Sequence, residues 1–124
     1  MSNALRNNSG EQLVQAAKAY ITAHSTEKFS LQAIADALYV NKCYLLRQFK
    51  AHTGCTLLKY HNQVRCEQAK QMLADTALSI SEIGEAVGFV SSSHFTHVFK
   101  KTAGVTPTEY RDVHAARVIE PGRD

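Results

Sequence analysis

The sequence is poor in residues that interrupt helices and in patterns that mark strands. Its 124 residues include only two prolines, Pro107 and Pro121, and scarcely any stretch in which apolar and polar residues alternate. Proline breaks helix interiors, and alternation is the signature of a half-buried strand. Since 44% of the residues are apolar, the chain can still bury a core. These features predict an all-α protein of one compact unit, or of two small ones.

Long apolar segments are also missing. No apolar run approaches the length of a membrane span, and the N-terminus lacks the apolar core of a secretory signal. The three cysteines, Cys43, Cys55 and Cys66, are widely spaced and form no C-x-x-C pair. This pattern indicates neither a disulfide framework nor a zinc ribbon, and it fits a reduced cytoplasmic protein without membrane contact.

Motifs of enzymes and metal sites are absent from the sequence. It contains no glycine-rich phosphate loop, no nucleophile elbow and no paired carboxylates on one helix face. His94 and His97 lie three residues apart and Cys43 is a third ligand type, but the spacing does not complete a zinc site. We therefore predict no enzyme activity, no metal and no cofactor.

The net charge is only mildly positive. Fourteen Lys and Arg against eleven Asp and Glu give +3 with neutral histidines. Residues 1–54 hold six basic and three acidic side chains, whereas residues 55–124 hold eight of each. This balance permits nucleic-acid binding without requiring it.

Apolar residues that recur at intervals of three and four predict about seven helices. The predicted organisation is a polar lead over residues 1–10, a first subdomain over 11–54, a linker helix within 55–74, a second subdomain over 75–114 and a frayed tail over 115–124. The opening MSNA resembles residues added for expression, and we exclude it from the fold prediction.

Capping residues predict where these helices begin and end. Phe29 and Ile34 can form a hydrophobic staple around Ser30, while Ser79 and Glu82 form a capping-box pattern. The predicted N-caps are Ser30, Asn41, Ser79, Ser91 and Thr106, the last followed by Pro107 and Glu109, and the predicted C-caps are Gly54 and Gly104. Two short helices joined by a few residues form a helix-turn-helix, so the chain is predicted to contain two.

The two predicted helix-turn-helix units are an internal repeat. Residues 30–38 match 79–87 at an offset of 49, and residues 41–60 match 91–110 at an offset of 50. The matched positions include the caps, the stopping glycines and the aromatic pair Phe49 and Phe99. A duplicated scaffold without DNA contact would show the same repeat, but the helix-turn-helix spacing favours DNA binding.

A linker helix would separate the two units by a useful length. Such a helix spans about 25 to 28 Å, and two helix-turn-helix units on one face of DNA lie about 34 Å apart. One chain could therefore bind two adjacent major grooves.

The segment Ser91–Arg111 has an apolar stripe and a polar one. The apolar stripe consists of Phe95, Val98 and Phe99. The other consists of Ser92, Ser93, Thr96 and His97, followed by Lys100 and Lys101. Such a face can enter a major groove, with lysines on the phosphates, although an ordinary amphipathic helix with a solvated back is the alternative.

The motifs EIGEAVGF and SSSHFTHVFKKTAGVTPTEYR resemble the C-terminal signature of the AraC/XylS transcription regulators. Upstream, LQAIADALYVNKCYLLRQFKAHTGCTLLKYHNQVRCEQAKQML is similar to the family's first helix-turn-helix and linker helix, so the resemblance covers residues 12–111. It implies a DNA-binding domain of seven helices, in which the third and sixth are recognition helices.

The resemblance also implies roles for individual residues. Base contacts would come from Lys42, Cys43, Leu46 and Arg47 in the helix near 41–53 and from Ser92, Ser93, Thr96 and His97 in the helix near 91–103. Phosphate contacts would come from Lys50, Lys100 and Lys101, and from the backbone amides that begin the second and fifth helices. The partners implied are double-stranded promoter DNA, RNA polymerase and a sensor or dimerisation domain elsewhere in a longer protein.

Three positions depart from the family pattern. Leu46, in the first unit, is apolar where many relatives have a polar residue, so it would either contact a thymine methyl group or pack against the protein. In the second unit His97 replaces a more common arginine, so base contacts by that unit are expected to be weak. Gly84 stands where alanine is usual, which should destabilise its helix by up to about 1 kcal/mol. A helical protein-interaction module without DNA binding is the remaining alternative; it would lack the steep salt dependence of phosphate neutralisation.

Overall fold

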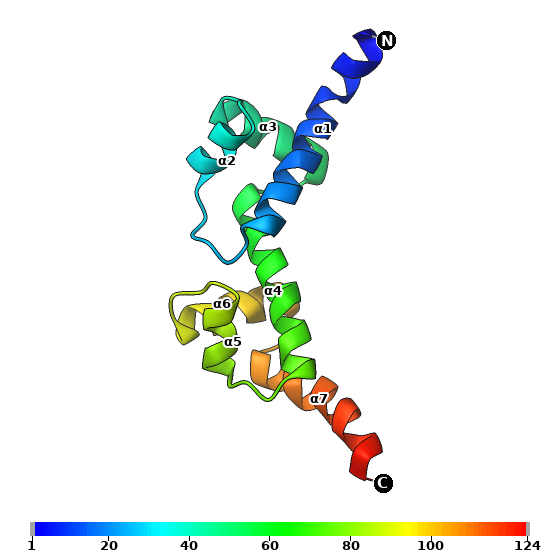
Figure 1. Ribbon diagram of the computed structural model, residues 1–124, viewed down its shortest axis with the longest axis vertical. Coiled ribbons are helices and arrows are strands. Elements are labelled where there is room, and N and C mark those ends of the chain that lie inside the picture. The colour runs from blue at the N-terminus through cyan, green and yellow to red at the C-terminus, as the bar shows by residue number, and fades with distance from the viewer. Residues whose placement is uncertain (1, 124) are drawn as a thin grey trace. The chain divides into compact units, whose positions relative to one another are not determined.

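The computed structural model describes the backbone of residues 2–123 and the side chains of residues 10–115. Within this range the chain forms seven α-helices and no strand, which confirms the all-α prediction (Figure 1). No helix in the described part is both long and apolar enough to span a membrane. The helices are α1 (Ser2–Ala23), α2 (Leu31–Ala37), α3 (Lys42–Thr53), α4 (Leu57–Asp75), α5 (Ile80–Ala86), α6 (Ser92–Ala103) and α7 (Pro107–Arg123).

The helices gather into two compact units, residues 1–61 and 62–124. The first turn of α4 therefore belongs to the first unit and the rest of α4 to the second, so the stretch predicted as a separate linker is divided between them. The reason is that both parts of α4 have apolar residues to bury. Leu57 is buried in the first unit, and Ala69 and Leu73 are buried in the second.

In the first unit α3 packs against both α1 and α2. The buried apolar residues recur at helical spacing on all three helices and continue into α4. They are Val14, Ala17, Ile21, Ile34, Ala35, Leu45, Phe49 and Leu57. This core fixes one side of α3 and leaves the other side to solvent.

The second unit has the same plan, with α4 in the place of α1. One core cluster joins α4, α5 and α6 and the turn before α6, and it consists of Cys66, Ala69, Leu73, Ile83, Val87, Phe89, Phe95, Val98 and Phe99. Phe99 lies at the centre of a row of aromatic rings, 5.7 Å from Phe95 and 5.8 Å from Tyr110 between ring centroids. This row connects α6 to α7.

The helix ends follow the predicted capping pattern. Ser79 Oγ accepts a hydrogen bond from the Glu82 N–H at 3.0 Å, and the Glu82 carboxylate accepts one from the Ser79 N–H at 2.8 Å. Thr106 and Glu109 form the same reciprocal pair at 3.1 and 2.8 Å at the start of α7. Ser30, Asn41 and Ser91 also accept hydrogen bonds from the first turns of their helices, and Gly54 and Gly104 adopt left-handed φ values of 78° and 86°.

The two ends of the chain are more helical than the sequence predicted. Within the predicted polar lead, residues 2–10 belong to α1, and the predicted tail is helical as far as Arg123. At the first end no proline interrupts the helix. Gly10 is buried against α3, so close that a Cβ added to it would lie 2.9 Å from His52 Nε2. At the second end the helix formers Ala115, Ala116 and Arg117 extend α7 beyond the predicted boundary.

The internal repeat extends further than the sequence revealed. Val14, Ala17 and Ile21 of α1 correspond at an offset of 52 to Cys66, Ala69 and Leu73 of α4, and all six are buried. The Nζ atom of Lys18 lies 5.7 Å from the ring centroid of Tyr60, and that of Lys70 lies 5.9 Å from the ring centroid of Tyr110. These two lysine–tyrosine pairs therefore also occupy matched positions of the repeat. Each unit therefore consists of a long helix, two shorter ones and a further helix, which is the first turn of α4 in the first unit and α7 in the second.

Candidate nucleic-acid interface

The outer face of α3 presents every residue that was predicted to contact DNA from the first unit. Lys42, Cys43, Leu46, Arg47 and Lys50 are all exposed. They recur at intervals of three and four, opposite the buried Leu45 and Phe49, so they share one face of the helix. Leu46 is 42% exposed and therefore packs only partly against the protein.

The outer face of α6 presents the corresponding residues of the second unit. Ser92, Ser93, His97, Lys100 and Lys101 are exposed, whereas Thr96 is half-buried. The opposite face holds Phe95, Val98 and Phe99 in the core. The sequence therefore predicted the orientation of this helix, and Thr96 lies at the edge of the exposed face.

The charge on these two faces is of one sign. Neither α3 nor α6 contains an aspartate or glutamate, although α2 and α5, which precede them, contain three. The exposed cations are Lys42, Arg47 and Lys50 on α3, and Lys100 and Lys101 in the last turn of α6. A helix that exposes only neutral and cationic side chains suits a polyanion such as the DNA backbone.

The turns before the two helices are closed in the same way. The Val40 N–H donates to the Ala35 carbonyl at 3.0 Å, and the Phe89 N–H donates to the Gly84 carbonyl at 2.9 Å. Val90 is the one extra residue of the second turn, and it is 94% exposed. The insertion therefore lies outside the hydrogen-bonded part of the turn.

Gly84 sets how closely α5 approaches α6. A Cβ at position 84 would lie 2.8 Å from Phe95 Cδ2 and 2.9 Å from Phe95 Cγ, closer than side chains normally pack. In the first unit the matched positions hold Ala35 and Leu45, both fully buried. The second unit thus combines a smaller residue on α5 with a larger one on α6, which the sequence analysis did not detect.

The beginning of α5 is a poor place for a phosphate. The resemblance implied that its backbone amides would hold one, but the Glu82 carboxylate already accepts the Ser79 N–H there. Hydrogen bonds from the Ser79 backbone and then from its side chain hold the pKa of Glu82 below its ordinary range, so the carboxylate is charged. A negative charge at this helix end competes with a phosphate.

Three buried polar side chains, those of Ser25, His61 and Arg65, were missed by the sequence analysis, because charged and polar residues are usually placed outside. Arg65 of α4 is only 7% exposed, and its guanidinium carbon lies 5.1 Å from the centroid of the Phe89 ring. Burial lowers its pKa. His61 is 3% exposed and its ring lies edge-on to that of Phe29, at 5.4 Å between centroids.

Arg111, from the EYR end of the signature, has a structural role in the second unit. Its Nε donates to the Leu73 carbonyl at 3.1 Å and its terminal nitrogen to the Thr76 carbonyl at 3.2 Å. It thus satisfies carbonyls at the end of α4 that the helix leaves unpaired. His61 occupies the matched position of the first unit.

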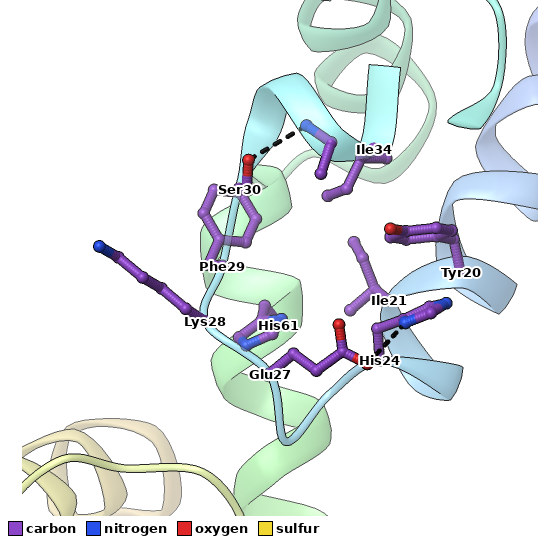
Figure 2. A pocket seen from close by; sticks show the side chains of 10 residues that line it. Tyr20, Ile21, His24, Glu27, Lys28, Phe29, Ser30, Ile34 and His61 are labelled. Atoms are coloured by element: carbon purple, nitrogen blue, oxygen red, sulfur yellow. Dashed lines mark hydrogen bonds and ion pairs between the residues drawn. The ribbon is translucent and has the colours of Figure 1, made fainter. Parts of the chain in front are cut away.

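A small pocket lies beside His61 in the first unit (Figure 2). The segment between α1 and α2 forms one side of it, with a 2.8 Å hydrogen bond between His24 and Glu27. Its volume is about 40 Å³, enough for one or two water molecules but far below the several hundred Å³ of a typical small-molecule site. This pocket is therefore not a candidate effector site.

The three cysteines are free thiols in different surroundings. Cys43 is exposed, Cys55 is half-buried, and Cys66 is buried in the second core, where burial raises the pKa of its thiol. Among the residues whose side chains are described, no three His, Cys, Asp or Glu gather as a metal site would require. His94 instead lies edge-on to Phe89 at 5.4 Å between ring centroids.

Fold and surface together define an all-helical protein with two helix-turn-helix units, each offering a cation-bearing helix to solvent. Comparisons with known proteins agree with this class. A family model described as a helix-turn-helix domain matches residues 34–112. The chain is 36% identical over 94 residues to the bifunctional transcriptional activator/DNA repair enzyme AdaA of Bacillus subtilis, covering 76% of this chain and 44% of AdaA.

Solved structures give the same result. An AraC-type transcriptional regulator from Chromobacterium violaceum is 34% identical, with a TM-score of 0.80, over 87% of this chain and 97% of that one. The DNA-binding domain of the global transcriptional factor AdpA, solved with a target DNA, is 26% identical, with a TM-score of 0.76, over 84% of this chain and 94% of that one. This chain belongs to the AraC/XylS family and forms an AraC-type DNA-binding domain of a transcription regulator. A protein-interaction module without DNA binding is not favoured.

Proposed function

We propose that this domain binds promoter DNA in a sequence-specific manner, with α3 and α6 in two adjacent major grooves. One observation carries the proposal: two twelve-residue helices, each following a helix-turn-helix turn, expose cations and contain no acidic residue, and α6 also exposes short polar side chains.

Within α3 the main base contact is assigned to Arg47. Its guanidinium can bind guanine O6 and N7 in a bidentate way, worth about 1 to 3 kcal/mol of discrimination. Leu46 can contact a thymine methyl group, and Lys42 and Cys43 lie at the start of the helix, where recognition helices approach base edges. Lys50, in the last turn, is assigned to a phosphate.

Within α6 the base contacts are assigned to four short or neutral side chains. Ser92 and Ser93 can donate to or accept from base edges, and so can Thr96 at the edge of the face and the imidazole of His97. Lys100 and Lys101 bind phosphates. None of these side chains makes the bidentate guanine contact of an arginine, so we expect the second unit to contribute less specificity than the first.

The full-length protein is larger than this domain in our proposal. The chain spans less than half the length of AdaA, so a sensor or dimerisation domain would be joined to it. AdaA is described as a transcriptional activator, which supports activation, and hence a contact with RNA polymerase, as the outcome of promoter binding. Such a regulator acts in the bacterial cytoplasm, on the nucleoid, and this domain itself performs no catalysis.

Two alanine substitutions test the assignment. Arg47→Ala should weaken binding to a specific duplex by about 1 to 3 kcal/mol and relax the preference at one base pair. Lys100→Ala should weaken binding to all duplexes nearly equally and reduce the salt slope by about one, because one phosphate contact is lost. Titrations by fluorescence anisotropy, on a panel of duplexes at several salt concentrations, measure both effects.

The same panel contains the outcomes that would contradict the proposal. If Arg47→Ala and Lys100→Ala behave alike on every duplex, Arg47 is not a base contact. If the unmodified domain binds no duplex with a salt-dependent constant, the domain is a protein-interaction module instead.

A further inference from the structure

The turn before α3 contains a tyrosine in a backbone conformation that suits glycine. Tyr39 has a φ of 58°, and no other non-glycine residue of the described chain has a positive φ. A side chain in this region is strained, because its Cβ approaches the following carbonyl oxygen. Gly88 holds the matched position of the second turn, with a φ of 111°. The repeat therefore shows which residue this turn accepts without strain.

Packing within the protein does not explain the tyrosine. Its side chain is 94% exposed, whereas Tyr44 and Tyr60 of the same unit are half-buried. Its backbone N–H donates to the Asp36 carbonyl at 3.2 Å, a bond that glycine would make equally well. A strained position occupied by a large exposed residue, with no compensating contact in the fold, is a sign of function.

The position of Tyr39 indicates what it contacts. It precedes the N-cap Asn41 by two residues. In a bound helix-turn-helix the start of the recognition helix contacts base edges and the helix before it crosses the DNA backbone. The turn between them therefore lies at the edge of the groove, where phosphates are the nearest groups. Tyrosine is among the side chains that donate hydrogen bonds to DNA phosphates.

We propose that Tyr39 is a phosphate-contacting residue of the first helix-turn-helix unit, whose hydroxyl donates a hydrogen bond to the DNA backbone beside the groove that α3 enters. This inference rests on the DNA binding proposed above. The contact is neutral, so it releases no counterion and carries no sequence preference. These two properties distinguish it from the contacts assigned to Lys50 and Arg47.

Tyr39→Phe and Tyr39→Gly test the proposal on a labelled duplex of arbitrary sequence, about 30 base pairs or three helical turns long. Tyr39→Phe should weaken binding about three- to tenfold, the usual worth of one hydrogen bond, equally at every salt concentration. The slope of log K against log salt should stay that of the unmodified domain, whereas Lys50→Ala should lower it by about one. Tyr20→Phe, which removes a hydroxyl from α1, is the control and should bind normally.

Tyr39→Gly should weaken binding at least as much as Tyr39→Phe while its melting temperature stays equal or rises, because the strain is relieved. Binding by Tyr39→Phe that matches the Tyr20→Phe control would overturn this inference and leave the proposed function standing. A melting temperature lowered by Tyr39→Phe would also overturn it, since the hydroxyl would then stabilise the fold. Failure of the unmodified domain to bind any duplex would instead overturn the proposed function.

Discussion

At position 84 a single missing methyl group decides how closely two helices approach. The Phe95 ring occupies the space that an alanine Cβ would need, while the matched pair in the first unit is Ala35 and Leu45. The two units thus fill the matched space in their cores with residue pairs of different size. From sequence alone, Gly84 predicted only a loss of helix propensity, because a clash between residues eleven apart depends on the intervening turn.

Gly84→Ala should destabilise the domain although alanine favours helices. Overpacking a core typically costs about 1 to 3 kcal/mol, against a propensity gain of at most about 1 kcal/mol. Adding Phe95→Leu recreates the pair of the first unit, so the double variant should be more stable than the sum of the single effects by about 1 kcal/mol. Urea denaturation of the four proteins measures this coupling. Strictly additive effects would show that the contact is not under strain.

The exposed residues of α3 and α6 were the most predictable part of the site. Their exposure follows from helical spacing around Leu45, Phe49, Phe95 and Phe99, which the sequence already showed. The buried His61 and Arg65 were not predictable, because their polar side chains are normally solvated and their burial depends on rings from distant segments. Sequence therefore indicates which helix face is exposed more reliably than it indicates which polar residues are buried beneath it.

At the scale of elements, the caps predicted the fold best. Each proposed N-cap makes its hydrogen bond because Ser, Thr and Asn hold amides that the first turn of a helix leaves unpaired. The relation between α1 and α4 was missed for a geometric reason. The connection before α2 has three more residues than the one before α5, so the repeat changes its offset from 52 to 49 between them.

The two capping boxes predict a pH dependence of stability. Hydrogen bonds from the backbone and then the side chain of Ser79 lower the pKa of Glu82, and those from Thr106 lower the pKa of Glu109 in the same way. Since the folded pKa values lie below the ordinary value of about 4.5, this stabilisation is present above that pH. It is lost as the pH falls through the lowered values.

Replacing both glutamates by glutamine tests this assignment. The variant Glu82→Gln with Glu109→Gln keeps an acceptor for each amide but no titrating group. Its melting temperature should therefore fall less than that of the unmodified domain as the pH is lowered below the ordinary glutamate pKa of about 4.5, because both folded-state pKa values lie below it. Glu85→Gln, which alters an exposed glutamate of α5 outside the capping boxes, is the matched control. Parallel curves for the double variant and the unmodified domain would mean that the boxes contribute nothing to the acid sensitivity.

At the scale of the whole molecule, the chain is a duplication in which one long helix contributes to both units. The first turn of α4 lies in the first unit and its remaining turns in the second. The duplication was visible in the sequence, whereas the division of α4 was not, because a helix of continuous apolar spacing gives no sign of which core each turn enters.

The differences between the units give them unequal roles in this account. The first unit has Arg47 and Tyr39, whereas the matched positions of the second unit hold His97 and Gly88, respectively. We therefore expect the first unit to supply most of the base specificity and the second to add mainly phosphate contacts.

Selection from a randomised duplex library, with sequencing of the bound fraction, tests whether both units bind bases. We expect two enriched blocks whose centres lie about one helical turn, 10 to 10.5 base pairs, apart, with the stronger block containing the guanine contacted by Arg47. Repeating the selection with Arg47→Ala should weaken that block and leave the other in place. A single enriched block, or two blocks without a fixed spacing, would contradict recognition of adjacent major grooves by the two units.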